Sequence, residues 1–178
     1  MLMRFRGIFP SIAKTSWVAP SADIIGDVQI GEDCSIWFGV VIRGDVHRIR
    51  IGSRVSVQDL SMIHITHYTK EDKSDGSPTT IGDDVTIGHK VMLHGCTIEN
   101  GCLIGMGATI LDGAVIGEGS IVGANSLVTS NKVFPPKSLI MGNPAKVVKE
   151  LTDEQVKGLI THAAYYASLK DEYIDLIS

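Results

Sequence analysis

The chain has 178 residues, 44% of them hydrophobic, and its 16 Lys and Arg against 20 Asp and Glu give a formal net charge of −4. This length is enough for one well-buried domain with a short appendage. No extended basic cluster occurs, so we expect no nucleic-acid partner. The first residues lack the apolar core of a signal peptide, and no run of about 18 apolar residues could span a membrane. We therefore expect a cytoplasmic protein that does not associate with membranes.

The chain contains three cysteines, Cys34, Cys96 and Cys102. Their number is odd and they form no C-x-x-C pair, which argues against a disulfide framework and against a thiolate zinc site. A free cysteine commonly behaves as a small buried apolar side chain. We therefore expect all three to be reduced and buried.

An aliphatic residue, often followed by Gly, recurs every six positions along most of the chain. The positions of this repeat are Ile30, Ile36, Ile42, Ile51, Val57, Ile63, Ile81, Ile87, Leu93, Ile98, Ile104, Ile110, Ile116, Val122 and Val128. A hexapeptide repeat predicts a parallel β-helix, in which six residues make one short strand and a turn, and three such units make a coil. The aliphatic side chains then point inward and stack from coil to coil. The expected fold class is an all-β solenoid, with the β-helix domain at residues 1–150.

Two irregularities modify this simple ladder. The spacing from Ile42 to Ile51 is nine residues, which predicts a bulge of three residues around 47–50. After Val128 the repeat fades, and the sequence F-P-P-K at 134–137 is expected to end it.

A third irregularity lies between Ile63 and Ile81, where Thr66–Pro78 lacks the aliphatic positions of the repeat. We expect this segment to leave the solenoid as a loop, so that Ile63 and Ile81 occupy consecutive inward positions. Long insertions at a solenoid corner commonly carry function.

The end of the chain changes from a six-residue period to a helical one. Thr152 and Gln155 have the spacing of a capping box, which predicts the start of an α-helix. Residues 151–178 are therefore expected to form a helix packed on the outside of the solenoid. The residues expected on its apolar face are Val156, Leu159, Ile160, Ala163, Ala167, Ile174 and Ile177.

The repeat gives a register for the histidines of H-K-V-M-L-H-G at 89–95 and of the preceding coil. His64 follows Ile63 by one residue and His94 follows Leu93 by one, and three repeats, which make one coil, separate Ile63 from Leu93. His64 and His94 should therefore stack in one column, about 5 Å apart, which is the spacing of adjacent strands. Arg43 belongs to the same column, one coil earlier.

His89 follows Ile87 by two residues and so falls on another flank of the solenoid. About 15 Å of extended chain separates it from His94, so the two cannot readily share a metal within one chain. Asp59 follows Val57 by two and lies in the same column as His89. In a three-fold assembly, the first column of one subunit would face the second column of the next.

Three imidazoles that converge with an open fourth position would make a catalytic zinc site. The alternative is that exposed histidines on a solenoid are only solvated or paired with carboxylates. We favour the metal site because the three histidines are in register and are flanked by Arg43, Asp45, Gln58 and Asp59.

At these residues the chain resembles the gamma-class carbonic anhydrases, a family of left-handed β-helix homotrimers. The resemblance rests on W-V-A-P-S-A-D-I-I-G-D-V near the start, I-W-F-G-V-V-I-R-G-D at 36–45, V-Q-D at 57–59, H-x(24)-H-x(4)-H at 64, 89 and 94, and M-G-N-P-A-K at 141–146. It implies a left-handed parallel β-helix with a C-terminal α-helix. The repeat and N-P-A-K alone would also suit hexapeptide acyltransferases.

The resemblance also implies roles for individual residues. His64 and His94 of one subunit and His89 of its neighbour would bind Zn2+, or Fe2+ or Co2+ in its place. Gln58 would hydrogen-bond the metal-bound hydroxide. A network of ion pairs at the subunit interface would consist of Arg43, Asp45 and Asp59.

The chain departs from the family pattern at two positions near this site. Ser56 stands where many members have Asn, and Val46 stands where some active members have a carboxylate that helps to export protons. In the Thr66–Pro78 loop, His67, Glu71 and Asp72 could take over proton export, or the loop could be only a solvated charged segment.

The function expected from the resemblance is reversible hydration of carbon dioxide to bicarbonate by a zinc-bound hydroxide at the subunit interfaces of a homotrimer. Two alternatives remain open. The chain could be a metal-binding homologue with little or no hydratase activity. It could instead be a hexapeptide acyltransferase, which would bind no metal and would use one imidazole as a general base beside an acyl-coenzyme A groove.

Overall fold

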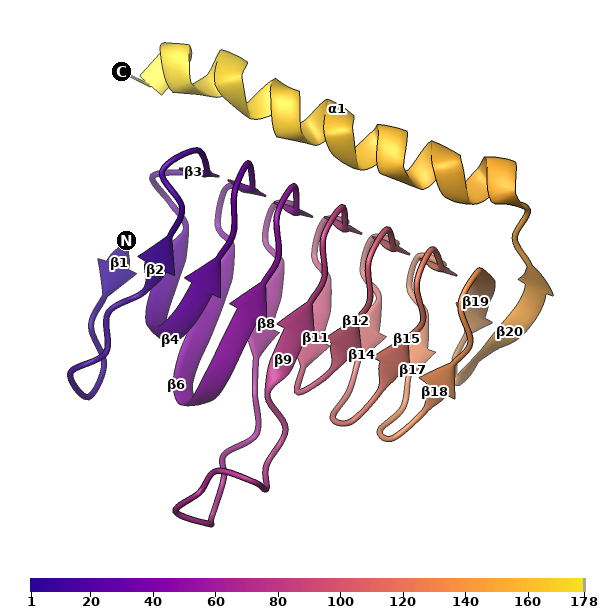
Figure 1. Cartoon of the computed structure of the whole chain (residues 1–178), viewed down its shortest axis with the longest axis horizontal. Coiled ribbons are helices and arrows are strands. Elements are labelled where there is room, and N and C mark those ends of the chain that lie inside the picture. The colour runs from indigo at the N-terminus through magenta and orange to yellow at the C-terminus, as the bar shows by residue number, and fades with distance from the viewer. Residues whose placement is uncertain (178) are drawn as a thin grey trace.

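The structure is a computed structural model that describes residues 1–177. Short parallel strands wind into a left-handed β-helix, and one long helix lies along its outside (Figure 1). This confirms the fold class expected from the six-residue repeat.

The solenoid is a triangular prism whose three faces are ladders of stacked strands. The first face consists of β8 (Met62–His64), β11 (Met92–His94), β14 (Thr109–Ile110) and β17 (Leu127–Val128). The second consists of β9 (Thr79–Ile81), β12 (Thr97–Ile98), β15 (Val115–Ile116) and β18 (Val133–Phe134). The third consists of β3 (Trp17–Val18), β5 (Ser35–Ile36), β7 (Ser56–Val57), β10 (Thr86–Ile87), β13 (Leu103–Ile104), β16 (Ile121–Val122) and β19 (Ser138–Gly142).

Two long strands join the first and second faces near the N-terminus. These are β4 (Asp23–Ile30) and β6 (Val41–Ile51), and β1 (Leu2–Met3) and β2 (Ser11–Ile12) pair with β4. Between Gly26 and Val28 β4 advances two residues, while its partner β6 advances five, from Gly44 to Ile49. The three extra residues therefore fall within 45–48 and not at 47–50 as predicted. The predicted bulge of three residues is thus confirmed, but it begins earlier than predicted because Ile49, inside the expected range, is itself fully buried.

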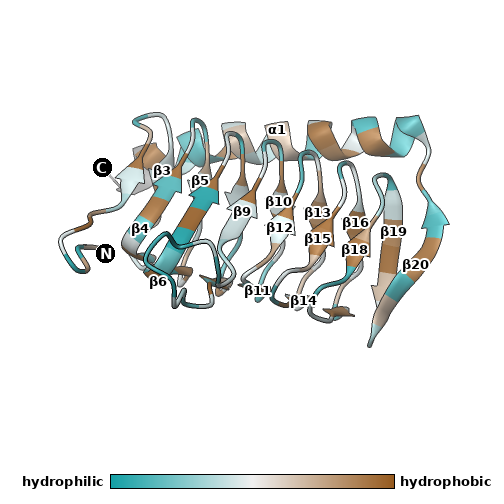
Figure 2. Cartoon of the chain, turned by 60° about the horizontal axis from the view of Figure 1, so that its bottom comes forward, coloured by the Kyte–Doolittle hydropathy of each residue, from teal (hydrophilic) through white to brown (hydrophobic). Residues whose placement is uncertain are grey.

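The core is a stack of the aliphatic residues that define the repeat. Leu93 pairs with Ile63 on one side and with Ile110 on the other, and all three are completely buried. Figure 2 shows hydrophobic positions that recur strand after strand along the solenoid. Each inward side chain thus contacts its equivalents in neighbouring coils, which is the packing that stabilises solenoids.

The sequence predicts that the repeat fades after Val128, but in the structure it continues. Phe134 and Ile140 each lie six residues beyond the preceding inward position, and they are 8% and 0% exposed. The chain then reverses at a cis Asn143–Pro144 bond. Strand β20 (Ala145–Glu150) returns antiparallel to β19 and lies at the end of the solenoid (Figure 1).

The helix α1 (Asp153–Ile177) begins at the predicted capping box. The Thr152 N–H donates to the Gln155 side-chain oxygen (3.0 Å), and the Gln155 N–H donates to the Thr152 hydroxyl (3.2 Å). Leu159 and Ala163 are buried as expected. Ile160 and Ile174 are exposed, contrary to the prediction, and the side chain of Ile177 lies outside the described residues.

Aromatic residues take the place of these isoleucines. The Tyr173 ring centroid lies 4.9 Å from that of Trp37, and the Trp37 and Trp17 ring centroids lie 5.2 Å apart. Tyr166 also packs against Trp37, with centroids 6.4 Å apart. Edge-to-face contacts of this kind add to the hydrophobic gain of burial. The helix therefore turns its aromatic side toward the third face of the solenoid.

The cysteines are as expected. Cys34, Cys96 and Cys102 are free and buried. Burial raises the pKa of the Cys96 and Cys102 thiols to about 12, so both stay protonated near neutral pH. Within the described part of the chain, no helix has the length and apolar character needed to cross a membrane.

Candidate metal centre

His64 and His94 end neighbouring strands of the first face, and their rings lie against each other. The two residues are paired in register, and His64 Nδ1 lies 3.1 Å from His94 Nε2. A tetrahedral zinc ion with Zn–N bonds of about 2.0–2.1 Å separates two ligand nitrogens by about 3.3 Å. The observed distance is close to that value.

A carboxylate holds the other nitrogen of each ring. His64 Nε2 lies 3.0 Å from Asp45 Oδ1, and His94 Nδ1 lies 3.0 Å from Asp112 Oδ1. Because an ionised carboxylate only accepts hydrogen bonds, we assign the ring protons to these two nitrogens. Two lone pairs then face each other with no proton between them. A cation placed there would remove this repulsion, so the donor set suits a metal ion.

Metal ligands in proteins are commonly held in this way, since a histidine that binds metal usually donates its second N–H to a carboxylate or a carbonyl. Burial lowers the pKa of His64, which favours the neutral imidazole that metal binding requires. Burial alone would raise the pKa of the Asp45 carboxyl, but hydrogen bonds from His64 and Arg43 together hold it below its ordinary value. Asp45 is therefore ionised near neutral pH.

His89 lies at a different corner of the prism, in the turn between β10 and β11. Its Nδ1 is 2.8 Å from Asp59 Oδ2, which confirms that these two residues share a column. The His89 side chain is 47% exposed. Like the other two histidines, it has one nitrogen on a carboxylate and the other free for a ligand.

Within one chain, residues 1–177 contain no group of three His, Cys, Asp or Glu side chains close enough to hold a metal together. His64 and His94 provide two donors at one corner, and His89 provides a third at another. This separation agrees with the expectation from the register that His89 does not share a metal with His94 of its own chain.

A cavity of about 210 Å³ lies beside His89, between the solenoid and α1. Gln58 and Asp59 line it, together with aromatic and aliphatic side chains that include Trp37 and Tyr166. Gln58 is only 6% exposed. The wall of this cavity is therefore mostly apolar, with the Gln58 amide as one of its few polar groups.

Ser56, the departure from the family pattern, does not line this cavity. It is 1% exposed, and its hydroxyl accepts a hydrogen bond from the Trp37 indole N–H (3.0 Å). Ser56 thus helps to fix Trp37 beneath α1.

The Thr66–Pro78 segment leaves the solenoid as a loop, as predicted, and its base is closed by a bridge between Thr66 and Ser77. His67, Glu71 and Asp72 are exposed, and no contact found in the described residues joins them to His64 or His94. The structure therefore does not bring the three candidates for proton export to the histidine pair.

Sequence reasoning missed two residues at this centre, Asp112 and Thr66. The Thr66 hydroxyl donates to Asp112 Oδ1 (2.8 Å), the oxygen that also faces His94. The register held a signal for Asp112, because Leu93 pairs with Ile110 and so places Asp112 beside Gly95. The signal for Thr66 was weaker, since the residue lies at the start of a loop without a repeat.

A family model described as bacterial transferase hexapeptide (six repeats) matches residues 9–44, 78–111 and 95–130. Protein YrdA of Escherichia coli is 47% identical over 175 residues, which cover 98% of this chain and 95% of that protein. A probable carbonic anhydrase of Methanocaldococcus jannaschii is 48% identical and covers 90% of this chain and 96% of its own.

Two further similar proteins are described as a carbonic anhydrase and as an acetyltransferase. Gamma carbonic anhydrase 1 of Arabidopsis thaliana mitochondria is 45% identical over 160 residues, which cover 90% of this chain and 58% of that protein. The crystal structure of a putative acetyltransferase of Bacillus cereus matches with a TM-score of 0.90 and 43% identity, and covers 98% of this chain and 97% of its own. These similarities extend over nearly the whole solenoid and the helix. The chain therefore belongs to the gamma-class carbonic anhydrase family of hexapeptide-repeat β-helix proteins.

Proposed function

We propose that this chain is a carbonic anhydrase that binds zinc between the subunits of a homotrimer and hydrates carbon dioxide reversibly to bicarbonate. The observation that carries the proposal is that His64 Nδ1 and His94 Nε2 lie 3.1 Å apart, while the other nitrogen of each ring lies 3.0 Å from a carboxylate oxygen. Relatives that are named carbonic anhydrases over nearly the same length support it. Fe2+ or Co2+ could occupy the same donor set.

In this proposal His64 and His94 of one subunit bind the metal together with His89 of the next. A zinc ion held by three imidazoles makes a coordinated water acidic enough to lose its proton near neutral pH. Asp45, Asp112 and Asp59 keep each imidazole in the tautomer that presents a lone pair.

The residues around His89 would receive the apolar substrate. Carbon dioxide has no charge and suits a cavity whose walls are largely Trp37, Phe38 and Tyr166. The Gln58 amide lies in the same cavity and can donate or accept a hydrogen bond to orient the reacting oxygen. Arg43 acts through Asp45, since its guanidinium contacts that carboxylate and not a histidine.

Assembly of subunits is part of the proposal, because the third ligand must come from another chain. His89 is half exposed in the single chain, and exposed apolar side chains lie on the same flank, including Leu60 (60%) and Met106 (57%). Burial of such residues against a second copy would stabilise the contact that completes the site. We also propose that this trimer acts in the cytoplasm.

Two other functions compete with this one. A metal-binding protein without hydratase activity would use the same ligands. A hexapeptide acyltransferase is favoured by the name of the similar Bacillus cereus structure and by a second cavity of about 260 Å³ along the third face, lined by Thr86, Leu103 and Met106 among others. That function requires no metal.

Metal analysis and stopped-flow hydration of carbon dioxide by the purified protein separate these functions. We expect about one metal ion per chain and a measurable hydration rate. The variant His89→Ala should lose both, while His67→Ala, which removes an exposed loop histidine, should keep its metal.

Each other outcome has a definite meaning. Bound metal without hydration would identify a non-catalytic metal-binding protein. A purified protein without metal, whose oligomeric state and properties are unchanged by His89→Ala, would contradict the proposed site and favour acyl transfer.

A further inference from the structure

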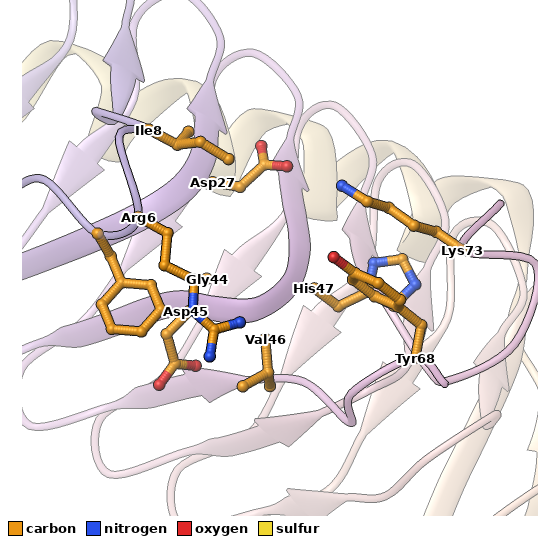
Figure 3. A pocket seen from close by; sticks show the side chains of 10 residues that line it. Arg6, Ile8, Asp27, Gly44, Asp45, Val46, His47, Tyr68 and Lys73 are labelled. Atoms are coloured by element: carbon orange, nitrogen blue, oxygen red, sulfur yellow. The ribbon is translucent and has the colours of Figure 1, made fainter. Parts of the chain in front are cut away.

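A third cavity, of about 210 Å³, is lined by Asp45, the residue that also contacts His64 of the histidine pair. It is enclosed by the N-terminal turn, strand β6 and the Thr66–Pro78 loop (Figure 3). Its polar lining consists of Arg6, Asp27, Asp45, His47, Tyr68 and Lys73. A water molecule in the liquid takes about 30 Å³, so the space holds a small polyatomic ligand with some of its hydration.

The two carboxylates of this cavity are already neutralised by cations outside its lining. Asp27 Oδ1 lies 2.7 Å from Arg50 Nη1. Asp45 is paired with Arg43 and hydrogen-bonded to His64. Neither carboxylate therefore leaves a net negative charge in the cavity.

The two cations that line the cavity have no such partner. Arg6 lies over the Phe5 ring, 5.2 Å from its centroid, and Lys73 lies over the Tyr68 ring at 5.1 Å. In residues 1–177, no carboxylate is found within ion-pair distance of Arg6 or Lys73. Aromatic rings thus position both cations while their N–H donors stay free. The cavity carries a net positive charge.

His47 supports this arrangement without adding charge. It is 5% exposed, and its Nδ1 accepts the Arg48 N–H (2.8 Å). Burial lowers its pKa, so the ring stays neutral near neutral pH. His47 packs edge-on against Tyr68, with centroids 5.3 Å apart, and the Tyr68 hydroxyl points toward the open space of the cavity (Figure 3).

We propose that this cavity binds a small oxyanion between Arg6, Lys73 and the Tyr68 hydroxyl. Guanidinium and ammonium groups with free N–H donors are the usual partners of oxyanions. The choice of bicarbonate as that anion rests on the proposed function, while the anion site itself does not. Asp45 is the wall shared by the cavity and the histidine pair, since it lines the cavity and contacts His64. The cavity therefore adjoins the proposed metal centre through Asp45.

The test is an NMR titration of the full-length chain with sodium bicarbonate. Each addition of bicarbonate replaces an equivalent amount of sodium chloride, so that the ionic strength stays constant. The protein is treated with a chelator, so that an anion on a metal gives no signal. We expect saturable shifts of backbone amide signals at residues 6, 44–47, 68 and 73. The variants Arg6→Ala and Lys73→Ala should each weaken binding by about tenfold, the usual value of a charged hydrogen bond.

Arg4→Ala and Lys70→Ala are the matched controls, because both residues are exposed cations near the cavity that do not line it. They should leave the affinity unchanged. Titrations with formate, sulfate and phosphate identify the anion. Tighter saturable binding of sulfate or phosphate would support the site and overturn bicarbonate as its ligand. Absence of saturable binding, or binding that survives both Arg6→Ala and Lys73→Ala, would overturn the site.

Discussion

The Thr66 hydroxyl and His94 Nδ1 meet at one atom, Asp112 Oδ1, at 2.8 and 3.0 Å. Thr66 opens the long loop, and His94 is a proposed metal ligand. Asp112 therefore connects the base of the loop with the imidazole. Asp112 also lies so close to Gly95 that a Cβ added at position 95 would be 2.1 Å from Asp112 Oδ1, and one of the two groups would have to shift.

Replacement of Asp112 should weaken metal binding without preventing folding. Asp112→Ala removes the acceptor that holds the proton on His94 Nδ1, and such losses typically reduce metal affinity by about 10- to 100-fold. Asp112→Asn keeps a carbonyl oxygen as acceptor and should lose less. Competition with a chromophoric chelator measures the affinity, and ¹⁵N NMR of the metal-free imidazoles reports the tautomer.

Asp84→Asn provides the control, because Asp84 pairs with Arg54 at a solenoid corner and contacts no histidine. Equal losses in Asp84→Asn and Asp112→Ala would show that Asp112 acts only through stability.

Mixed trimers test the distribution of ligands between subunits. Protein with His64→Ala and protein with His89→Ala should each bind almost no metal. When the two are unfolded together and refolded as an equal mixture, an interface is intact only if one neighbour has His64 and the other has His89. Random assembly gives this at about one quarter of the interfaces (½ × ½). Metal analysis of the mixture should recover about that share.

His64→Ala mixed with His94→Ala is the matched control, since both ligands come from the same corner of one chain. That mixture should recover no metal. Recovery in it, or no recovery in the first mixture, would contradict the shared site.

Two glycine substitutions should have opposite effects on stability. Gly95 has φ of +58°, and Gly95→Ala would place a methyl group against Asp112 and the Ser77 side chain. The left-handed backbone alone costs about 1–2 kcal/mol, so the free energy of unfolding should fall by about 2 kcal/mol or more. Gly158 lies in α1, where a Cβ added to it would contact no atom outside the helix backbone within 4 Å, so Gly158→Ala should stabilise the protein by about 0.5–1 kcal/mol. Urea unfolding measures both. A stable Gly95→Ala would show that Asp112 can withdraw.

Stability of the metal-free protein should fall as the pH is lowered through about 6. Burial lowers the pKa of His47 in the folded chain, while in the unfolded chain it is near 6.5. At pH values between the folded and the unfolded pKa of His47, the unfolded state binds more protons than the folded state, so stability rises with pH. The contribution of one such histidine is limited to about 1.4 kcal/mol per pH unit. Urea midpoints at pH 7.5 and 5.5, with chelator present, measure it.

His47→Gln should reduce the difference between the two midpoints but not abolish it, because burial also lowers the pKa of His64, which remains. Asp45 has a lowered pKa as well, but its contribution is lost only below its unfolded pKa of about 3.9 and so does not enter this range. An unchanged difference in His47→Gln would assign the pH dependence to other groups.

The solenoid was predictable because one period fixes both the strands and their stacking. Once Ile63 and Leu93 are in register, the positions of His64 and His94 follow without any knowledge of side-chain conformation. The separate corner of His89 follows in the same way. Local deviations were harder: Ile49 belongs to an eleven-residue strand that runs around a corner, and the period gives no information about such a strand.

The contacts that complete the centre depend on three-dimensional distance and not on period. Asp112 reaches His94 because Gly95 leaves room for it, a fact that neither residue reveals alone. The helix shows a similar limit. Its apolar stripe favoured Ile160 and Ile174, but the shape of the Trp17 and Trp37 surface favours tyrosine rings.

Strand β20 has a consequence for growth of the molecule along its own axis. A stack of parallel strands ends in a row of unpaired backbone groups, onto which another molecule could add end to end. The antiparallel return of β20 covers the last strand, β19, and presents Lys146, Lys149 and Glu150, which are exposed. Charged side chains on an edge strand oppose such addition. The β19–β20 hairpin thus opposes end-to-end addition on the third face of the solenoid.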